Sequence, residues 1–132
     1  MKSPSDRRVY IAAPKEELSR ALHASAVLRG RGVTVCSTWH DTYAAGTPDP
    51  NDLDLAKRIL AQNQLDLAHA THVLALPHAT YGREMYVEVG RALERGRSVA
   101  FSNERGGLPL SWADENADVY DSDASATDAV SR

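Results

Sequence analysis

The sequence predicts a single α/β domain, with a doubly wound parallel sheet of four to five strands and helices on both faces. Two observations support this fold. Short apolar runs alternate along the chain with stretches whose apolar residues recur every three or four positions. The chain has 132 residues, which is enough for one domain with one hydrophobic core. Right-handed β-α-β connections then distribute the helices over both faces, in a flavodoxin-like arrangement.

Five short apolar runs are the predicted strands: residues 8–13, 33–39, 71–77, 98–101 and 117–120. Pro14 ends the first run, and the second is rich in Val and Thr, which favour strands. The third contains the continuous apolar run Val73–Leu76, as is typical of a central strand that is buried on both faces. The last run is short and follows a loop, so the sheet has four strands without it and five with it.

Three amphipathic stretches are the predicted helices: residues 15–29, from Asn51 or Asp52 to about Ala70, and residues 83–95. The first ends at Gly30 and the third at Gly96, since glycine commonly follows the last turn of a helix. Either residue named at the start of the second helix is a good N-cap. Residues 40–50 consist of turn formers and polar residues, and they predict a loop.

The composition argues against several classes of partner. A net charge of −3 and a pI of about 5.9 argue against a nucleic-acid polymer, because surfaces that bind one are usually strongly basic. The longest apolar run is far shorter than the ~20 residues of a membrane span. No apolar stretch follows the charged N-terminus as in a secretory signal, so we expect a cytoplasmic protein. We expect a domain at residues 1–120 and a flexible polar tail at residues 121–132.

Neither a metal nor a cofactor is predicted. The single cysteine, Cys36, excludes an internal disulfide and a cysteine-based zinc site. His69, His72 and His78 are close in sequence, but a strand would separate the last two by roughly 20 Å. The first loop after a strand, residues 13–16, has neither the Gly-rich dinucleotide pattern nor a P-loop.

Carboxylates on two predicted helices are candidates for catalysis. Ligands of open parallel sheets bind at the carboxyl ends of the strands, and Glu88 lies about one turn inside a helix that begins near this edge. Asp66 lies on the otherwise inward-facing ridge of the preceding helix. Two carboxylates facing one cleft suit glycosidic chemistry, with one as nucleophile and one as proton donor. Alternatively, Glu88 pairs with Arg91 on a solvated face, and Asp66 lies at the surface.

Three stretches resemble the nucleoside 2-deoxyribosyltransferase family, whose superfamily also includes nucleoside-5′-monophosphate N-glycosidases. They are Val9–Pro14 (VYIAAP), Asp66–Leu76 (DLAHATHVLAL) and Gly82–Val99 (GREMYVEVGRALERGRSV). The most specific element is the pattern Glu-x-Gly-x-Ala-Leu-x-x-Gly-Arg-x-Val, which begins at Glu88. The resemblance covers about residues 8–102.

The resemblance implies a covalent mechanism. Glu88 matches the family's nucleophile, which attacks the anomeric carbon and forms a (deoxy)ribosyl-enzyme. Asp66 matches the aspartate that addresses or protonates the departing base, and Tyr10 matches the tyrosine whose hydroxyl orients the nucleophile. Gly90 would let the helix pack closely on the sheet. The acceptor, a second base or water, then distinguishes a transferase from a hydrolase.

The sequence departs from the family pattern at Gly82, where transferases carry an aspartate that reads the base and the monophosphate hydrolases a serine that contacts phosphate. We expect Gly82 and Arg83 to contact the substrate, with Arg83 as a bidentate phosphate ligand. Lys15 would hold a phosphate near a helix N-terminus, or be a solvated lysine. The spacing between Gly82 and Glu88 leaves Glu84 as a competing nucleophile.

The expected function is cleavage or transfer at the N-glycosidic bond of a (deoxy)nucleoside or nucleotide. One alternative is a nucleoside 5′-monophosphate N-glycosidase, which uses water, and another is a non-catalytic nucleotide-binding module on the same fold. Aromatic residues near the ligand edge and on the third helix predict a homodimer or a higher homo-oligomer with that helix near the contact: Trp39, Tyr43, Tyr86 and Trp112. Alternatively, Trp39 and Trp112 stack on the base, and we include Trp39 among the expected substrate-binding residues.

Overall fold

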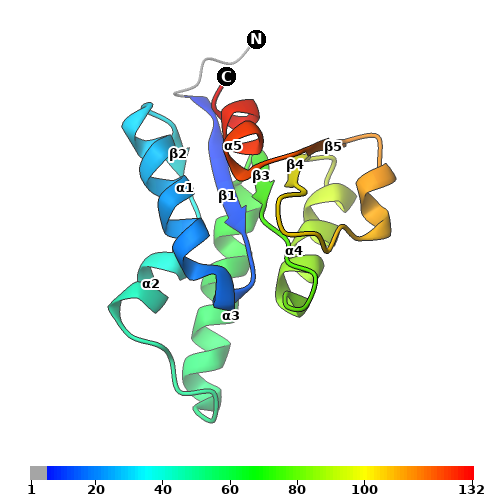
Figure 1. Cartoon of the computed structure of the whole chain (residues 1–132). Coiled ribbons are helices and arrows are strands. Elements are labelled where there is room, and N and C mark those ends of the chain that lie inside the picture. Colours follow the sequence, from blue (N-terminus) through cyan, green and yellow to red (C-terminus); the bar gives the residue numbers. More distant parts are fainter. Residues whose placement is uncertain (1–5) are drawn as a thin grey trace.

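The computed structural model describes residues 6–132, which contain one sheet of five parallel strands in the order β2-β1-β3-β4-β5 (Figure 1). The strands are β1 (Arg8–Ala12), β2 (Thr34–Val35), β3 (His72–Ala75), β4 (Ser98–Ser102) and β5 (Ala117–Tyr120). The sheet grows from β1 in both directions, so the strand order reverses between β1 and β3. The predicted doubly wound parallel fold is confirmed.

Five α-helices and the short 3-10 helices η2 and η3 accompany the sheet within residues 6–132. They are η2 (Lys15–Glu17), α1 (Leu18–Gly30), α2 (Trp39–Ala45), α3 (Leu53–His69), α4 (Arg83–Glu94), η3 (Leu110–Ala113) and α5 (Asp123–Ser131). Helices α1 and α5 pack together on one face of the sheet, and α3 and α4 cover the other face (Figure 1). Among these helices, none is long and apolar enough to cross a membrane.

The interior strand β1, which lies between β2 and β3, carries the predicted site residue Tyr10. Val9, Tyr10, Ile11 and Ala12 are fully buried, as expected for a strand that has helices on both faces. Successive residues of a strand point to opposite faces, so Tyr10 points away from the side that Val9 and Ile11 face. The hydroxyl of Tyr10 contacts Glu88 of α4, which places the ring on the α3/α4 face.

The second strand is shorter than predicted, and α2 occupies part of the predicted loop. Ser37 Oγ accepts a hydrogen bond of 3.0 Å from the backbone N–H of Ile11, and Trp39 Nε1 donates one of 2.8 Å to the carbonyl of the same residue. These two side chains occupy the backbone groups of β1 that a longer β2 would bond. The chain therefore leaves the sheet after Val35, and α2 begins at Trp39.

The prediction of a flexible tail at residues 121–132 is wrong, because this segment forms helix α5. Ser122 caps the helix, with its hydroxyl oxygen accepting a hydrogen bond of 3.1 Å from the N–H of Ser125. Ala126 and Val130, one turn apart, are buried, and the helix packs on β3 and β4. The amphipathic pattern of α5 is weak in the sequence, because the buried side of the helix consists mainly of small residues.

The loops at the carboxyl ends of the strands are locked to one another by close backbone contacts. Gly107 has a φ of +78°, and a Cβ at this position would lie 2.3 Å from the carbonyl oxygen of His78. The hydroxyl of Tyr86, on the first turn of α4, donates a hydrogen bond of 2.6 Å to the carbonyl of Gly107. This packing fixes the amino end of α4, and with it the position of Glu88.

Candidate active site

The site is centred on a hydrogen bond between the hydroxyl of Tyr10 and Oε2 of Glu88. Tyr10 is fully buried in β1, and Glu88 is half-buried in the second turn of α4. The two residues are 78 positions apart in the sequence, and the packing of α4 against β1 brings them together. Glu84, one turn earlier on the same helix, is exposed. Of the two glutamates that the sequence leaves as nucleophile candidates, only Glu88 contacts Tyr10.

The environment of Glu88 changes its acidity. Burial raises the pKa of Glu88 to about 7, and the negative charge of Glu84 adds to the effect. The hydrogen bond from Tyr10 and the positive charge of Arg91 act in the opposite direction. Burial and the charge of Glu88 raise the pKa of Tyr10, so the phenol stays protonated and remains a donor. Glu88 therefore changes its charge near neutral pH.

Asp66 is the second carboxylate of the site. It lies near the end of α3 with only 7% of its surface exposed. Thr38 Oγ1 donates a hydrogen bond of 2.6 Å to Oδ2, and Gln62 Nε2 donates one of 2.7 Å to Oδ1. The charge of Asp66 also contributes to the raised pKa of Tyr10, after the larger effects of burial and Glu88. Tyr10 is thus coupled electrostatically to both carboxylates.

Gly82 and Arg83 lie at the amino end of α4, where the sequence predicts substrate contacts. Gly82 is the N-cap residue with a φ of +122°, and a Cβ on it would lie 3.2 Å from Cγ of Pro14. This glycine therefore brings the start of α4 close to the loop after β1. Lys15, the first residue of η2, follows in that loop. The side chains of Arg83 and Lys15 are exposed, and neither forms a hydrogen bond or ion pair with residues 6–132.

Trp39 lies in the core, contrary to its expected role in substrate binding. Only 6% of its surface is exposed, and its ring nitrogen donates to the carbonyl of Ile11. The rings of His40 and Tyr43 contact it edge-on, at centroid distances of 5.5 and 5.9 Å. A ring enclosed in this way has no open face on which a base can stack. The strand pattern that ends in Trp39 does not distinguish such a core residue from one that lines a pocket.

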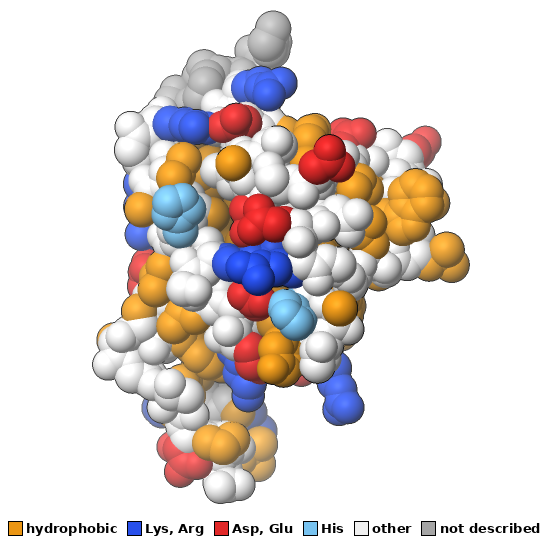
Figure 2. Space-filling model, viewed as in Figure 1, with side chains coloured by type: hydrophobic (Ala, Val, Ile, Leu, Met, Phe, Trp, Pro, Cys, Tyr) orange, Lys and Arg blue, Asp and Glu red, His pale blue; other side chains and the backbone are white. Residues whose placement is uncertain are grey.

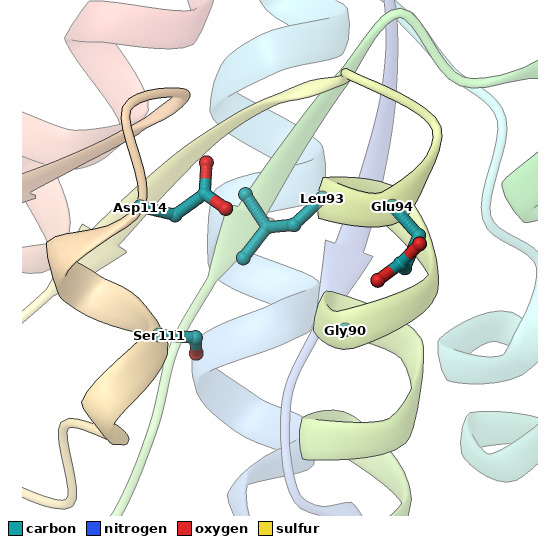
Figure 3. A pocket seen from close by; sticks show the side chains of 5 residues that line it. All are labelled: Gly90, Leu93, Glu94, Ser111 and Asp114. Carbon is teal, nitrogen blue, oxygen red and sulfur yellow. The ribbon is translucent and has the colours of Figure 1, made fainter.

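Gly90 does not bring α4 close to the sheet, contrary to expectation. A Cβ at this position would meet no atom within 4 Å, because Gly90 faces an open cavity of about 370 Å³. Figure 3 shows this cavity between α4 and the η3 segment, with Leu93 and Glu94 opposite Ser111 and Asp114. Its lining includes none of the three predicted catalytic residues.

His78, which follows β3, has partners within the protein. His78 lies 3.5 Å from Glu17 and accepts a hydrogen bond of 3.0 Å from the N–H of Thr80. Its ring also packs against that of Tyr81. In the part of the chain that the structure describes, no group of three His, Cys, Asp or Glu residues is arranged to hold a metal ion.

Thr38 and Gln62 are the site residues that the sequence does not identify. Gln62 precedes Asp66 by one helical turn, so its spacing was a usable signal for the contact. Thr38 precedes α2 and is 28 positions from Asp66, and only the folded sheet brings the two together.

No protein-family model, no curated protein and no solved structure matches the chain.

Proposed function

We propose that the protein cleaves or transfers at the N-glycosidic bond of a (deoxy)nucleoside or nucleotide, with Glu88 as the nucleophile. The observation that supports this most strongly is the hydrogen bond from the buried hydroxyl of Tyr10 to the Glu88 carboxylate. Such a donor fixes the direction of the nucleophilic oxygen before the substrate arrives. The resemblance of the Glu88 segment to the nucleoside 2-deoxyribosyltransferases is consistent with this role.

The two carboxylates divide the proposed reaction between them. Glu88 attacks the anomeric carbon, the bond from that carbon to the base breaks, and its electron pair passes to the base nitrogen, which Asp66 protonates. A glycosyl ester on Glu88 results. An acceptor base or water then attacks the same carbon, releases Glu88 as a carboxylate and returns a proton to Asp66. Only the ionised form of Glu88 is nucleophilic, so turnover rises with pH as this residue loses its proton, near pH 7.

Hydrolysis of a nucleoside 5′-monophosphate is the second candidate. Arg83 and Lys15 are exposed cations at the first residues of α4 and η2, and the side chain of neither is paired within residues 6–132. A guanidinium at the start of a helix matches a phosphate in both charge and geometry. Replacing Arg83 by Met is expected to raise KM for a monophosphate while leaving KM for the corresponding nucleoside unchanged.

One assay distinguishes the candidates. The protein is incubated with 2′-deoxynucleosides and their 5′-monophosphates, with and without a second base, and the free and exchanged bases are separated by chromatography. Base exchange supports a transferase, and release of base without exchange supports a hydrolase. The absence of both reactions leaves a non-catalytic binding module. The matched variants are Glu88→Gln, expected to be inactive, and Glu84→Gln, expected to retain activity because Glu84 lies outside the Tyr10 contact.

We also propose that the protein forms a homodimer through α4 and η3. Leu110 and Trp112 of η3 are 88% and 50% exposed, and Val87 of α4 is 52% exposed. Figure 2 shows hydrophobic side chains gathered at the edge of the molecule where η3 lies. Exposed aromatic and aliphatic groups of this kind are typical of the centre of an interface. Tyr86, expected at the contact, instead binds Gly107 within the chain, so Val87 is the better candidate on α4.

A further inference from the structure

Asp66 is held by neutral donors from two separate elements of the fold. Gln62 lies one turn earlier on α3, and Thr38 lies in the connection between β2 and α2. Each donates to a different oxygen of the carboxylate, at 2.7 and 2.6 Å. Asp66 itself is buried, whereas the two donors are exposed residues. Thr38 and Gln62 therefore lie between this carboxylate and the solvent.

This arrangement matters at the moment when Asp66 gives up a proton. The oxygen that loses the proton gains negative charge in the transition state, and a hydrogen bond to a charged acceptor is about twice as strong as a neutral one. Donors that are already in place cost no reorganisation at that moment. Thr38 and Gln62 therefore stabilise the developing carboxylate more than they stabilise the neutral acid.

We propose that Thr38 is a positioning residue of the reaction, which orients Asp66 and stabilises the charge that forms on it as the base departs. The inference rests on the proposed function, because it assigns Asp66 the protonation of the leaving base. Gln62 supports the same carboxylate from the other oxygen. The contribution of Thr38 is greatest for a base that needs its proton most, and smallest for a base that departs readily as an anion.

The test compares Thr38→Val, which removes the hydroxyl, with Thr38→Ser, which keeps it. Turnover is measured with two deoxynucleosides, one with an ordinary base and one with a halogenated base that leaves more easily. For the ordinary base, Thr38→Val is expected to lower kcat about tenfold, the loss of one charge-assisted hydrogen bond, with KM within about twofold. The loss of kcat in Thr38→Val is expected to be clearly smaller for the halogenated base. Thr38→Ser, which keeps the hydroxyl, is expected to have the kcat of the wild type with both substrates.

A matched control is available on the next turn. The hydroxyl of Thr42 donates a hydrogen bond of 3.2 Å to the backbone carbonyl of Thr38, and Thr42→Val is expected to leave both kcat values unchanged. If Thr38→Val does not fold, Gln62→Leu removes the other donor from an exposed helix position and is expected to show the same dependence on the leaving base.

The possible outcomes separate the two proposals. An active wild-type protein in which Thr38→Val turns over both substrates normally, or loses equal activity toward both, overturns the role of Thr38 and leaves the proposed function standing. A wild-type protein that neither releases nor exchanges a base overturns both. A larger loss with the ordinary base, restored by serine, supports both.

Discussion

Glu88 is held in an environment that disfavours its charged form. Its pKa of about 7 lies well above the ordinary value of 4.5, because burial disfavours the charged form. Between these two values the unfolded chain has lost the proton and the folded protein still holds it. Stability from this group is therefore fully present below pH 4.5 and is lost as the pH rises through 7. At about 1.4 kcal/mol per pKa unit, the effect amounts to roughly 3 kcal/mol.

We predict that Glu88→Gln removes this dependence on pH. Glutamine still accepts the hydrogen bond from Tyr10 and carries no charge, so at pH 8 the variant should be more stable than the wild type by about 2–3 kcal/mol. The difference should vanish near pH 4.5. Urea unfolding at several pH values gives the free energies, with Glu84→Gln as the exposed control.

The quantity to measure is the difference in free energy of unfolding between Glu88→Gln and the wild type. The buried His40 has a pKa lowered mainly by burial, so its own contribution to stability is fully present above its ordinary pKa of 6.5 and is lost as the pH falls through its lower pKa in the folded protein. The contribution of His40 therefore rises with pH, whereas that of Glu88 falls, and the contribution of His40 is the same in both proteins. Equal free energies of unfolding for Glu88→Gln and wild type at every pH would show that Glu88 is not held in a buried, charge-disfavouring environment.

Tyr10→Phe is predicted to change the pH at which the protein becomes active. The hydrogen bond from Tyr10 lowers the pKa of Glu88, so its loss raises that pKa further. The rising limb of kcat/KM should move to higher pH by about one unit, and kcat should fall at neutral pH. Tyr43→Phe, which removes a hydroxyl from a half-buried tyrosine of α2, serves as control. If the rising limb of kcat/KM stays at the same pH in Tyr10→Phe, the hydrogen bond from Tyr10 does not lower the pKa of Glu88.

Two ion pairs join α5 to α1 and to Arg31, the residue that follows α1, and they differ in burial. Arg20 is buried and binds Asp123 through two hydrogen bonds, while it also donates to the carbonyl of Pro77 at 3.0 Å. Arg31 binds Asp128 at 2.5 Å, but about 45% of each side chain is exposed. Removing one partner of a buried pair leaves an uncompensated charge, whereas water solvates the partner that remains of an exposed pair.

We therefore predict that Arg20→Met lowers the free energy of unfolding by about 3 kcal/mol, and Arg31→Met by less than about 1 kcal/mol. Thermal or urea unfolding of the two variants measures the difference. Hydrogen exchange should show α5 losing protection in Arg20→Met, because this contact anchors the first turn of the helix. Similar small losses in both variants would mean that α5 is held by its apolar face alone.

The elements that could be predicted are those whose signals are local. Asp52, one of the two N-caps that the sequence allows, caps α3, and α4 occupies residues 83–94 where 83–95 is predicted, because both helices have clear caps or terminal glycines. Helix α2 could not be predicted, because it depends on the hydrogen bonds that Ser37, as acceptor, and Trp39, as donor, form with the backbone of Ile11 in β1. The same contacts place Trp39 in the core rather than in a pocket. The Thr38–Asp66 bond likewise depends on packing between distant segments.

For the whole molecule, the proposed assembly makes a direct prediction. In sedimentation velocity at micromolar concentration, the protein should have twice the 14.4 kDa mass of the chain. Trp112→Asp, at an exposed position of η3, should give the single-chain mass without loss of thermal stability. The control is Leu65→Asp, an exposed leucine on α3, away from η3. A wild-type protein of single-chain mass would contradict the dimer.

The doubly wound sheet brings β1 and α4 together, and we propose that this contact makes Glu88 a nucleophile. The most direct measurement is intact-protein and peptide mass spectrometry after rapid acid quenching of the protein with a 2′-deoxynucleoside and no acceptor base. We predict a mass increase equal to one 2-deoxyribosyl group, on the peptide and side chain of Glu88, and its absence in Glu88→Gln. Release of free base without an adduct at Glu88, or an adduct on Glu84 instead, would contradict the account.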